Sequence, residues 1–478
     1  MNTKKCHSHM LWLTLPLVFL AVIAIAPPTA SAATPTVRVG SPSGTDDTAH
    51  IQSALDQCMK LYPTGCTVQF GAGTYYSQQV IAENFHGTVR GMGMGVTTVE
   101  VIAPLVVTIS DENLEDNPPS RTNKYPILMT FLAGDITVSD IGFKVTAYNP
   151  TTPWWYGGLG PNQTWMEGFV GVVSSTTANL LIQRVEFEGA PGPPYGETNV
   201  NNGPLYWGCC SGPVTGTFKV VSSRFKQIGN GLEIWGVLNS RMTIGGSPLD
   251  GNVYENCEGG VVSGDADNSI LQVSYNNVQT VTNSEWAGVV IMQGILQMPQ
   301  KPTQFIIQNN KIAAIGYYQD GILLFDNGVA SGTGKTANLI VANNTLQMSG
   351  DELGPAFSAV QLDSTEGVLI LNNRITGAGE NGIGSWSGTQ SAFVGNDLSH
   401  FTADPAGGLG DIYLDPTTTN DLVVCAEPTD SVVNQGANNV VIGCQDPAAT
   451  AASTATENAV PAVTRPRPGL LKGGPRPR

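Results

Sequence analysis

The chain has 478 residues, of which 38 are Asp or Glu and 22 are Lys or Arg, so its formal net charge is −16 at pH 7. An acidic chain of this kind argues against nucleic-acid binding, because phosphate backbones attract basic surfaces. With 56 Gly and only 13% charged residues, the composition favours an all-β repeat protein with many turns over a helical protein.

The N-terminal residues have the pattern of a secretory signal peptide. Lys4 and Lys5 precede an apolar stretch from Leu11 to Ala26, and Ala30-Ser31-Ala32 is the small-x-small sequence of a cleavage site. The apolar stretch is shorter than the roughly 20 residues that a membrane-spanning helix needs. We therefore predict a signal peptide over residues 1–32, a secreted mature protein in an extracellular or periplasmic compartment, and no transmembrane segment after cleavage.

An exported protein keeps disulfide bonds, so the cysteines that follow the predicted signal are interpreted as bridges. Two pairs of these cysteines are close in sequence. A third bridge among the other three cysteines would leave one thiol unpaired. The predicted bridges are Cys58 with Cys66, Cys425 with Cys444, and Cys209 or Cys210 with Cys257. Zinc binding is the alternative, and the lack of a C-x-x-C motif argues against it.

The first predicted element is a short amphipathic helix. Asp46-Asp47-Thr48 is a sequence that caps helices, and four apolar residues follow at helical spacing: Ile51, Ala54, Leu55 and Cys58. The turn at Pro63-Thr64-Gly65 ends the helix. Alternating residues at 68–70 and 73–75 then predict the first β-strands.

This region resembles the pectin-lyase-like superfamily. Members of that superfamily commonly open with an acidic cap, an I-Q-x-A-L helix and a V-x-F-x-x-G-x-Y strand, and the match here runs from Asp46 to Tyr75. The resemblance implies an all-β fold, a single-stranded right-handed parallel β-helix with a short N-terminal capping helix over about residues 46–78. Such a cap covers the open end of the first coil. The resemblance indicates a fold rather than a reaction.

Downstream, an Asn followed two positions later by an aliphatic residue recurs once per predicted coil, where a coil has roughly 23 to 38 residues. The recurring residues are Asn276, Asn310, Asn344, Asn373 and Asn396. Asn tolerates left-handed backbone at turns, and stacked Asn side chains hydrogen-bond from one coil to the next. We therefore assign this column a structural role and no chemistry.

Another recurring strand begins at a small residue, as in Gly231-Leu232-Glu233-Ile234-Trp235. Because strand side chains alternate, the second and fourth positions point into the stack, and the third and fifth point outward. The first outward column contains Glu233, Val262, Val290, Leu323, Gln361, Gly384 and Tyr413, and the second contains Trp235, Gly264, Met292, Phe325, Asp363, Trp386 and Asp415. The resemblance implies that the sugar-binding groove runs along this same face.

Three acidic residues on or beside these columns are predicted to be catalytic. Glycoside hydrolysis needs two carboxyl groups, about 5 to 5.5 Å apart for retention or roughly 6.5 to 9.5 Å apart for inversion. Coils one or two steps apart supply such spacings, since neighbouring strands lie about 4.8 Å apart. Asp326 and Asp363 are predicted one coil apart, and Asp265 lies two coils from Asp326. The alternative is an acidic face that keeps the solenoid in solution and has no chemistry.

Other residues of the columns suit a sugar, which presents an apolar ring face and hydroxyl groups. The predicted substrate-binding residues are Trp235, Trp386, Glu233, Phe325, Gln361 and Tyr413. Aromatic residues in insertions at 153–156, 162–165 and 206–207 either form a wall beside this groove or pack on the flank of the solenoid.

The motifs of known enzymes in the superfamily are missing, since the chain has no G-H-G, R-I-K or D-P-H segment. Lys, Arg and His are scarce near the predicted groove, which disfavours β-elimination from a uronate. We therefore predict a secreted protein that binds and cleaves a polysaccharide with carboxylate acid–base chemistry. The alternatives are a polysaccharide lyase that uses Ca²⁺ and a non-catalytic glycan-binding or adhesin protein. Asp265-Ala266-Asp267-Asn268 is the candidate Ca²⁺ site.

No Pro- or Ser-rich linker divides the chain before residue 446, so residues 33–445 are predicted to form one β-helix domain, acting as a monomer. Residues 446–478 contain Ala, Thr and Ser stretches followed by Arg-Pro repeats. A segment of this composition cannot bury a core, and we predict a disordered tail.

Overall fold

A computed structural model describes residues 34–102, 119–146, 166–189, 200–208, 212–280, 287–293, 302–317, 319–326, 337–351, 354–403 and 410–445. The predicted signal peptide and tail lie outside these residues. So do Cys209, Cys210 and the insertions at 153–156 and 162–165.

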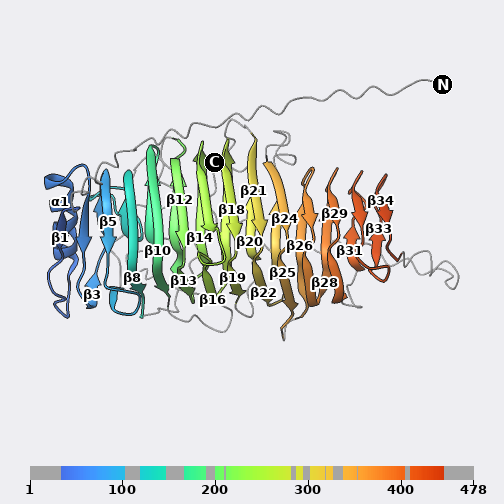
Figure 1. Cartoon of the computed structure of the whole chain (residues 1–478), viewed down its shortest axis with the longest axis horizontal. Coiled ribbons are helices and arrows are strands. Elements are labelled where there is room, and N and C mark those ends of the chain that lie inside the picture. The colour runs from blue at the N-terminus through green and yellow to red at the C-terminus, as the bar shows by residue number, and fades with distance from the viewer. Residues whose placement is uncertain are drawn as a thin grey trace, which may run out of the picture. The chain divides into compact units, whose positions relative to one another are not determined.

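The described residues contain one helix and 34 strands, arranged as the coils of a right-handed parallel β-helix (Figure 1). Each strand pairs in parallel with the equivalent strands of the coils before and after it. Three sheets result. The strands β8, β10 and β28 turn a corner and belong to two sheets each.

Sheet 1 contains β1 (Thr36–Arg38), β2 (Cys66–Gln69), β5 (Phe85–Arg90), β8 (Gly134–Lys144), β10 (Thr177–Glu188), β12 (Thr215–Val221), β15 (Arg241–Gly245), β18 (Ile270–Ser274), β21 (Thr303–Gln308), β24 (Ala337–Ala342), β27 (Leu369–Leu371), β29 (Ala392–Val394), β32 (Leu422–Val424) and β34 (Val440–Ile442). Sheet 2 contains β3 (Gly73–Ser77), β6 (Thr97–Val101), the second halves of β8 and β10, β13 (Arg224–Lys226), β16 (Val253–Cys257), β19 (Asn277–Thr280), β22 (Lys311–Ile315), β25 (Thr345–Ser349), β28 (Arg374–Trp386) and β30 (Asp397–Ala403).

Sheet 3 contains β4 (Val80–Ala82), β7 (Ile127–Phe131), β9 (Met166–Ser174), β11 (Val200–Gly208), β14 (Asn230–Leu238), β17 (Gly259–Asp267), β20 (Ala287–Met292), β23 (Asp320–Phe325), β26 (Ala356–Asp363), the second half of β28, β31 (Gly410–Leu414) and β33 (Val432–Asn434). This sheet carries the outward columns that the sequence predicts.

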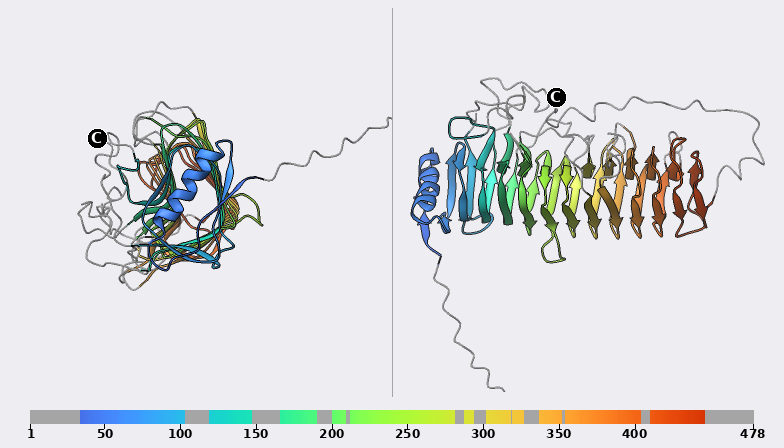
Figure 2. Two further views of the ribbon diagram at one scale, coloured as in Figure 1. Left: turned by 90° about the vertical axis from the view of Figure 1, so that its left-hand side faces the viewer. Right: turned by 90° about the horizontal axis from the view of Figure 1, so that it is seen from above.

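The single described helix, α1 (Thr48–Leu61), lies across the open end of the first coil (Figure 2, left). Its buried residues are the four apolar residues that the sequence predicts: Ile51, Ala54, Leu55 and Cys58. Asp46 accepts a hydrogen bond from the backbone N–H of Thr48 at 2.9 Å. The neighbouring Asp47 instead accepts the N–H of Tyr76 on β3 at 3.2 Å, so it ties the helix to the first coil.

The interior of the coils is filled by aliphatic and aromatic side chains from all three sheets. In sheet 2, rings from successive coils stack face to face: Phe187 lies 5.3 Å from Phe225, and Phe225 lies 4.4 Å from Tyr254. A small residue stands near the start of several sheet 3 strands, such as Gly231 in β14, because the chain passes close to this core there. A Cβ on Gly231 would lie 2.2 Å from the Tyr254 ring and 2.4 Å from the carbonyl oxygen of Gly260.

The predicted Asn column is confirmed as a buried ladder. Asn310 donates from Nδ2 to Asn344 Oδ1 at 3.0 Å and to the carbonyl of Val273 at 2.9 Å. Its backbone N–H donates to the same Asn344 Oδ1 at 3.0 Å. The left-handed backbone lies one residue earlier than the ladder, for example at Asn309 (φ 57°) and Asn343 (φ 56°). The ladder residues therefore act through their amides, and their predecessors make the turn.

The structure confirms two of the three predicted disulfides, Cys58–Cys66 and Cys425–Cys444. The third prediction is wrong, because Cys257 is a free and fully buried thiol at the end of β16. Its burial raises the pKa of the thiol to about 12. Among the described residues, no helix is long and apolar enough to cross a membrane.

Candidate functional site

The outward columns of sheet 3 have the register that the sequence predicts. The first column pairs from Glu233 through Val262, Val290, Leu323, Gln361 and Gly384 to Tyr413, and the second from Trp235 through Gly264, Met292, Phe325 and Asp363 to Trp386. Asp415 follows β31, and its N–H donates to the carbonyl of Ser385 at 3.0 Å.

Most side chains of these columns are buried, although they point away from the main core. Glu233 is 3% exposed and Gln361 is 1% exposed. The physical reason is that Val262, Val290 and Leu323 join a second apolar cluster on this outer face. Most of the predicted outward positions are therefore buried and not exposed to solvent. Phe325, Asp363 and Trp386, toward the C-terminal end of the columns, are half-buried.

Two carboxylates share one amide in the N-terminal part of this face. Asn202 on β11 donates from Nδ2 to Glu233 Oε2 at 2.7 Å and to Glu167 Oε1 at 3.2 Å. Trp235 donates from Nε1 to the other oxygen of Glu233. All four side chains are more than nine-tenths buried. We call Glu167, Asn202, Glu233 and Trp235 the buried carboxylate cluster. Its two bridged carboxylate oxygens lie at most about 6 Å apart, since both accept from one nitrogen.

Asp265 lies within β17 near its end, and Asp326 directly follows β23; both have left-handed backbone, with φ of 47° and 45°. Asp adopts this conformation more readily than most residues, which is a structural reason for its presence. Both side chains are buried, whereas the sequence predicts an outward acidic face. The N–H of Asp326 donates to the carbonyl of Asp363 at 2.9 Å, so these two predicted catalytic residues are neighbours on successive coils.

Aromatic rings and an acid gather in the C-terminal part of the same face. Trp386 stacks on Phe357 with ring centroids 5.4 Å apart and planes 19° apart, and its ring lies 5.7 Å from that of Tyr413. In the second column, Asp363 pairs with Phe325 on one side and Trp386 on the other. We call these five residues the aromatic–acid cluster.

Two of the predicted substrate-binding residues differ in their surroundings. Burial, together with the nearby charge of Asp415, raises the pKa of Tyr413, and its hydroxyl lies 3.4 Å from Gln435 Oε1. Trp386 is more exposed than Tyr413 and offers the larger ring surface. The indole of Trp386 is therefore more accessible to a ligand on this face than the phenol of Tyr413.

The sequence prediction missed Glu167 and Asn202. Asn202-Gly203 precedes Trp207 by the same spacing that separates Asn230-Gly231 from Trp235, and the two segments pair in register. That repeat was the signal that could have placed Asn202 on this face.

The aromatics at 206–207 are not in an insertion, because they belong to β11. Tyr206 is in the core, stacked on Phe218 with ring centroids 5.1 Å apart. Trp207 lies in the outer apolar cluster, with its ring centroid 6.1 Å from that of Tyr125. Neither ring forms a wall beside an open groove.

No group of three or more His, Cys, Asp or Glu side chains that could hold a metal ion occurs within the described ranges. In the candidate Ca²⁺ segment, Asp265 and Asp267 are buried at the end of β17. The carbonyl oxygen of Asp267 already accepts the N–H of Asn239 at 3.0 Å. The geometry of the segment therefore offers no evident set of Ca²⁺ ligands.

Comparison with known proteins gives a fold. No protein-family model and no curated protein sequence matches the chain. Among solved structures, DFA-IIIase from Arthrobacter chlorophenolicus A6 without its lid is 13% identical with a TM-score of 0.52, over 82% of this chain and 94% of that one. The surface adhesin PfbA of Streptococcus pneumoniae is 12% identical with a TM-score of 0.44, over 85% and 93%.

The Azotobacter vinelandii mannuronan C-5 epimerase AlgE4 A-module is 14% identical with a TM-score of 0.38, over 84% of this chain and 94% of that one. At these identities the likeness concerns the fold and not the activity. The chain has the parallel β-helix fold of pectin-lyase-like proteins, as its N-terminal motif predicts.

Proposed function

We propose that the protein is an exported polysaccharide hydrolase that binds its substrate at the aromatic–acid cluster. The observation that carries this proposal is the position of Asp363 between Phe325 and Trp386 in one column, with all three side chains half-buried. Aromatic rings on either side of a carboxylate suit the binding of a sugar. The rings contact the apolar face of the sugar, and the carboxylate accepts hydrogen bonds from its hydroxyl groups.

Asp326 and Asp363 are the proposed acid–base pair. They lie on successive coils, and the hydrogen bond from Asp326 N–H to the carbonyl of Asp363 fixes their backbones. Asp326 is buried and Asp363 is half-buried, so the two carboxyl groups have different surroundings. Glycoside hydrolysis uses one carboxyl group as the proton donor and a second as the base or nucleophile. The donor protonates the glycosidic oxygen, and the base activates a water or attacks the sugar.

Asp265, at the equivalent position two coils earlier, is the proposed third carboxylate of this site. The buried carboxylate cluster offers an alternative pair for the same reaction, since Glu167 and Glu233 share the amide of Asn202. We favour the Asp pair because one of its members, Asp363, is half-buried beside aromatic rings, whereas both Glu side chains are buried.

Export rests on two observations. The N-terminal sequence has the charged, apolar and small-x-small parts of a signal peptide over residues 1–32. The disulfides Cys58–Cys66 and Cys425–Cys444 support the same inference, because such bonds persist in oxidising compartments.

The test is an assay of the mature chain on neutral and acidic polysaccharides, with reducing ends and ultraviolet absorbance measured together. Hydrolysis releases reducing ends alone, whereas elimination also creates a conjugated double bond. Asp363→Asn should lower the rate by at least a hundredfold, since acid–base groups contribute about 10² to 10⁴. The matched control is Asp397→Asn, which removes a half-exposed carboxylate from sheet 2.

Three results would contradict the proposal in different ways. Absorbing products would identify a lyase. Loss of activity in Glu233→Gln but not in Asp363→Asn would move the acid–base pair to the buried carboxylate cluster. Glycan binding without any product would identify a binding protein of the adhesin class.

A further inference from the structure

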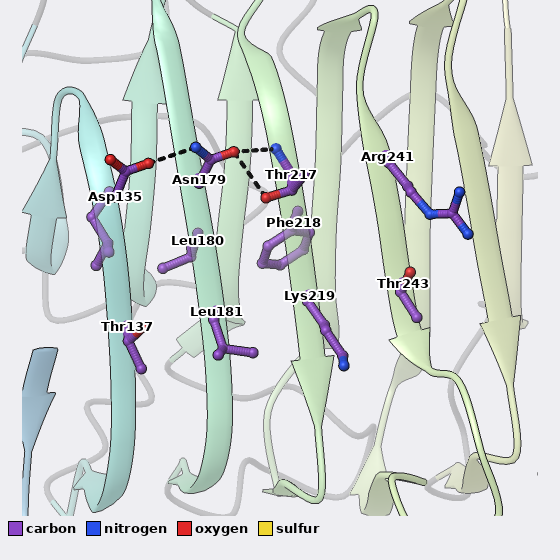
Figure 3. Close-up of a pocket in the computed structure, with 11 residues that line it drawn as sticks. Asp135, Thr137, Asn179, Leu180, Leu181, Thr217, Phe218, Lys219, Arg241 and Thr243 are labelled. Atoms are coloured by element: carbon purple, nitrogen blue, oxygen red, sulfur yellow. Dashed lines mark hydrogen bonds between the residues drawn. The ribbon is translucent and has the colours of Figure 1, made fainter. Parts of the chain in front are cut away.

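A shallow groove of about 500 Å³ crosses the outer face of sheet 1, which is a different face from the proposed substrate site. It spans β8, β10, β12 and β15, and its polar and charged lining residues include Asp135, Asn179, Thr217, Lys219 and Arg241. Figure 3 shows that these side chains come from four successive coils. We call this hollow the sheet 1 groove.

One side of the groove is a row of hydrogen-bonded polar side chains. Asn179 donates from Nδ2 to Asp135 Oδ1 at 2.6 Å, and Thr217 donates from Oγ1 to Asn179 Oδ1 at 2.8 Å (Figure 3). His86 on β5 extends the row, with Nδ1 2.8 Å from Asp135 Oδ2. These partners hold the pKa of Asp135 below its ordinary value, Asn179 having the largest effect.

The row keeps hydrogen-bonding capacity for a ligand. The second N–H of Asn179 Nδ2, the lone pairs of Thr217 Oγ1 and further lone pairs of the Asp135 carboxylate take no part in the bonds above. Donors and acceptors therefore alternate along the axis, one strand apart, or about 4.8 Å. A chain of sugar rings lying along the groove meets a polar group at each coil.

Two exposed cations also line the groove. Arg241 on β15 pairs in register with Thr217 and continues the polar row, and Lys219 lies two residues beyond Thr217 on β12. Within the described part of the chain, neither forms an ion pair. Arg184, on the corner-turning strand β10, does form one, with Asp140 Oδ1 2.6 Å from its Nε. In a chain with a formal net charge of −16, two adjacent unpaired cations give this groove a local positive region that attracts anions. The two side chains are placed to receive an anion from solution.

We propose that the sheet 1 groove is a second carbohydrate-binding site, which takes an acidic glycan. The carboxylate or sulfate groups of the glycan bind Lys219 and Arg241. The hydroxyl groups of the glycan bind Asn179 and Thr217. The negative charge of Asp135 lies three strands from Arg241, about 14 Å away, and its carboxylate is held by hydrogen bonds with Asn179 and His86. The site anchors the protein to an acidic polymer and is independent of hydrolysis on sheet 3.

The test is retardation of the mature protein in native gels that contain polygalacturonate, heparin or dextran. Polygalacturonate presents carboxylates, heparin presents sulfates as well, and dextran is neutral. We expect retardation by at least one acidic polymer, weakening as salt is added, and none by dextran. The double variant Lys219→Ala/Arg241→Ala should bind at least tenfold more weakly.

The control is Lys60→Ala/Lys311→Ala, which makes the same change in net charge at exposed positions on α1 and β22. It should bind as the unmodified protein does. Asp363→Asn should also bind normally, which separates this site from the one proposed on sheet 3. Equal loss in the control variant, no loss in the groove variant, or no retardation by either acidic polymer would overturn the proposal. Retardation by heparin alone would assign the anion as sulfate.

Discussion

Asn202 and Glu233, on the neighbouring strands β11 and β14, are joined by a buried hydrogen bond of 2.7 Å from Nδ2 to Oε2. The same nitrogen reaches Glu167 Oε1, so one neutral amide stands between two carboxylates. An amide in this position supplies a donor to each carboxylate without adding charge.

We expect Asn202→Asp to lower the free energy of unfolding by at least about 3 kcal/mol, since it removes the donor and adds a third buried carboxylate. The measurement is urea unfolding of the mature chain. Asn338→Asp, at an exposed position of β24, is the control and should change stability by less than about 0.5 kcal/mol. Equal stability of the two variants would show that the amide bridge contributes nothing.

Adjacent residues of the Asn turn are expected to respond differently to substitution. Asn310→Ala leaves the carbonyl of Val273 and the N–H of Asn276 without their partner, and should cost about 2 to 4 kcal/mol. Asn309→Ala loses only the tolerance of Asn for left-handed backbone, and should cost about 1 kcal/mol. Thermal unfolding of both variants compares the two costs, and the reverse order would contradict the ladder.

Stability should depend on pH through Asp421, which is buried where Ser391 donates its N–H to Oδ1 at 2.8 Å. Burial raises the pKa of this carboxyl from 3.8 to about 6, against the opposing effect of Ser391. The folded protein thus holds the proton more tightly than the unfolded chain. The protonated carboxyl stabilises the fold below about pH 4, and this contribution is lost as pH rises through about 6.

Asp421→Asn should therefore unfold at a higher temperature than the unmodified protein at pH 7. The difference should shrink as pH falls toward 4, which thermal unfolding across this range measures. A difference that stays constant with pH would show that Asp421 does not titrate differently in the folded and unfolded states.

The thiol of Cys257 should resist alkylation in the native protein. It is fully buried, and a raised pKa keeps it protonated, whereas the thiolate is the reactive form. Iodoacetamide followed by peptide mapping should modify Cys257 only after unfolding without reductant. Failure to modify it even then would mean that Cys257 is oxidised, as in the bridge to Cys209 or Cys210 that the sequence suggests.

Glycan binding on sheet 3 should depend on the indole of Trp386, because its ring offers the largest half-buried surface of the aromatic–acid cluster. Trp386→Ala should weaken binding of a hydrolysed polysaccharide about tenfold, whereas Trp386→Phe should retain most of the affinity. Titration calorimetry with a substrate identified by the activity assay makes the comparison. Unchanged binding in Trp386→Ala would exclude this face as the sugar site.

The register of sheet 3 could be predicted from the sequence because two physical demands repeat in every coil. A small residue is needed where Gly231 passes Tyr254, and an aliphatic residue must follow it into the core. Neither the small residue nor the aliphatic residue that follows it predicts that the outer face of sheet 3 is buried. This burial depends on contacts between distant segments, such as that between Tyr125 and Trp207.

The buried carboxylate cluster was missed for a related reason. Coil length alone does not align Glu167 and Asn202 with the later coils, and only the spacing from Asn202-Gly203 to Trp207 indicates where Asn202 lies. The pairing of Cys257 depended on the placement of distant residues, and spacing along the chain does not determine it.

Because the Asn ladder repeats from coil to coil, a whole coil can be removed or added without changing the pattern of hydrogen bonds. Asn276, Asn310 and Asn344 repeat at an interval of 34 residues, and each side-chain amide donates to the next one along the axis. Removing residues 310–343 would join equivalent points of two coils and leave every other rung in place. The length of the β-helix can thus change in steps of one coil. Each step changes the distance between the N-terminal and C-terminal ends of sheet 3 and leaves the residues at both ends unchanged.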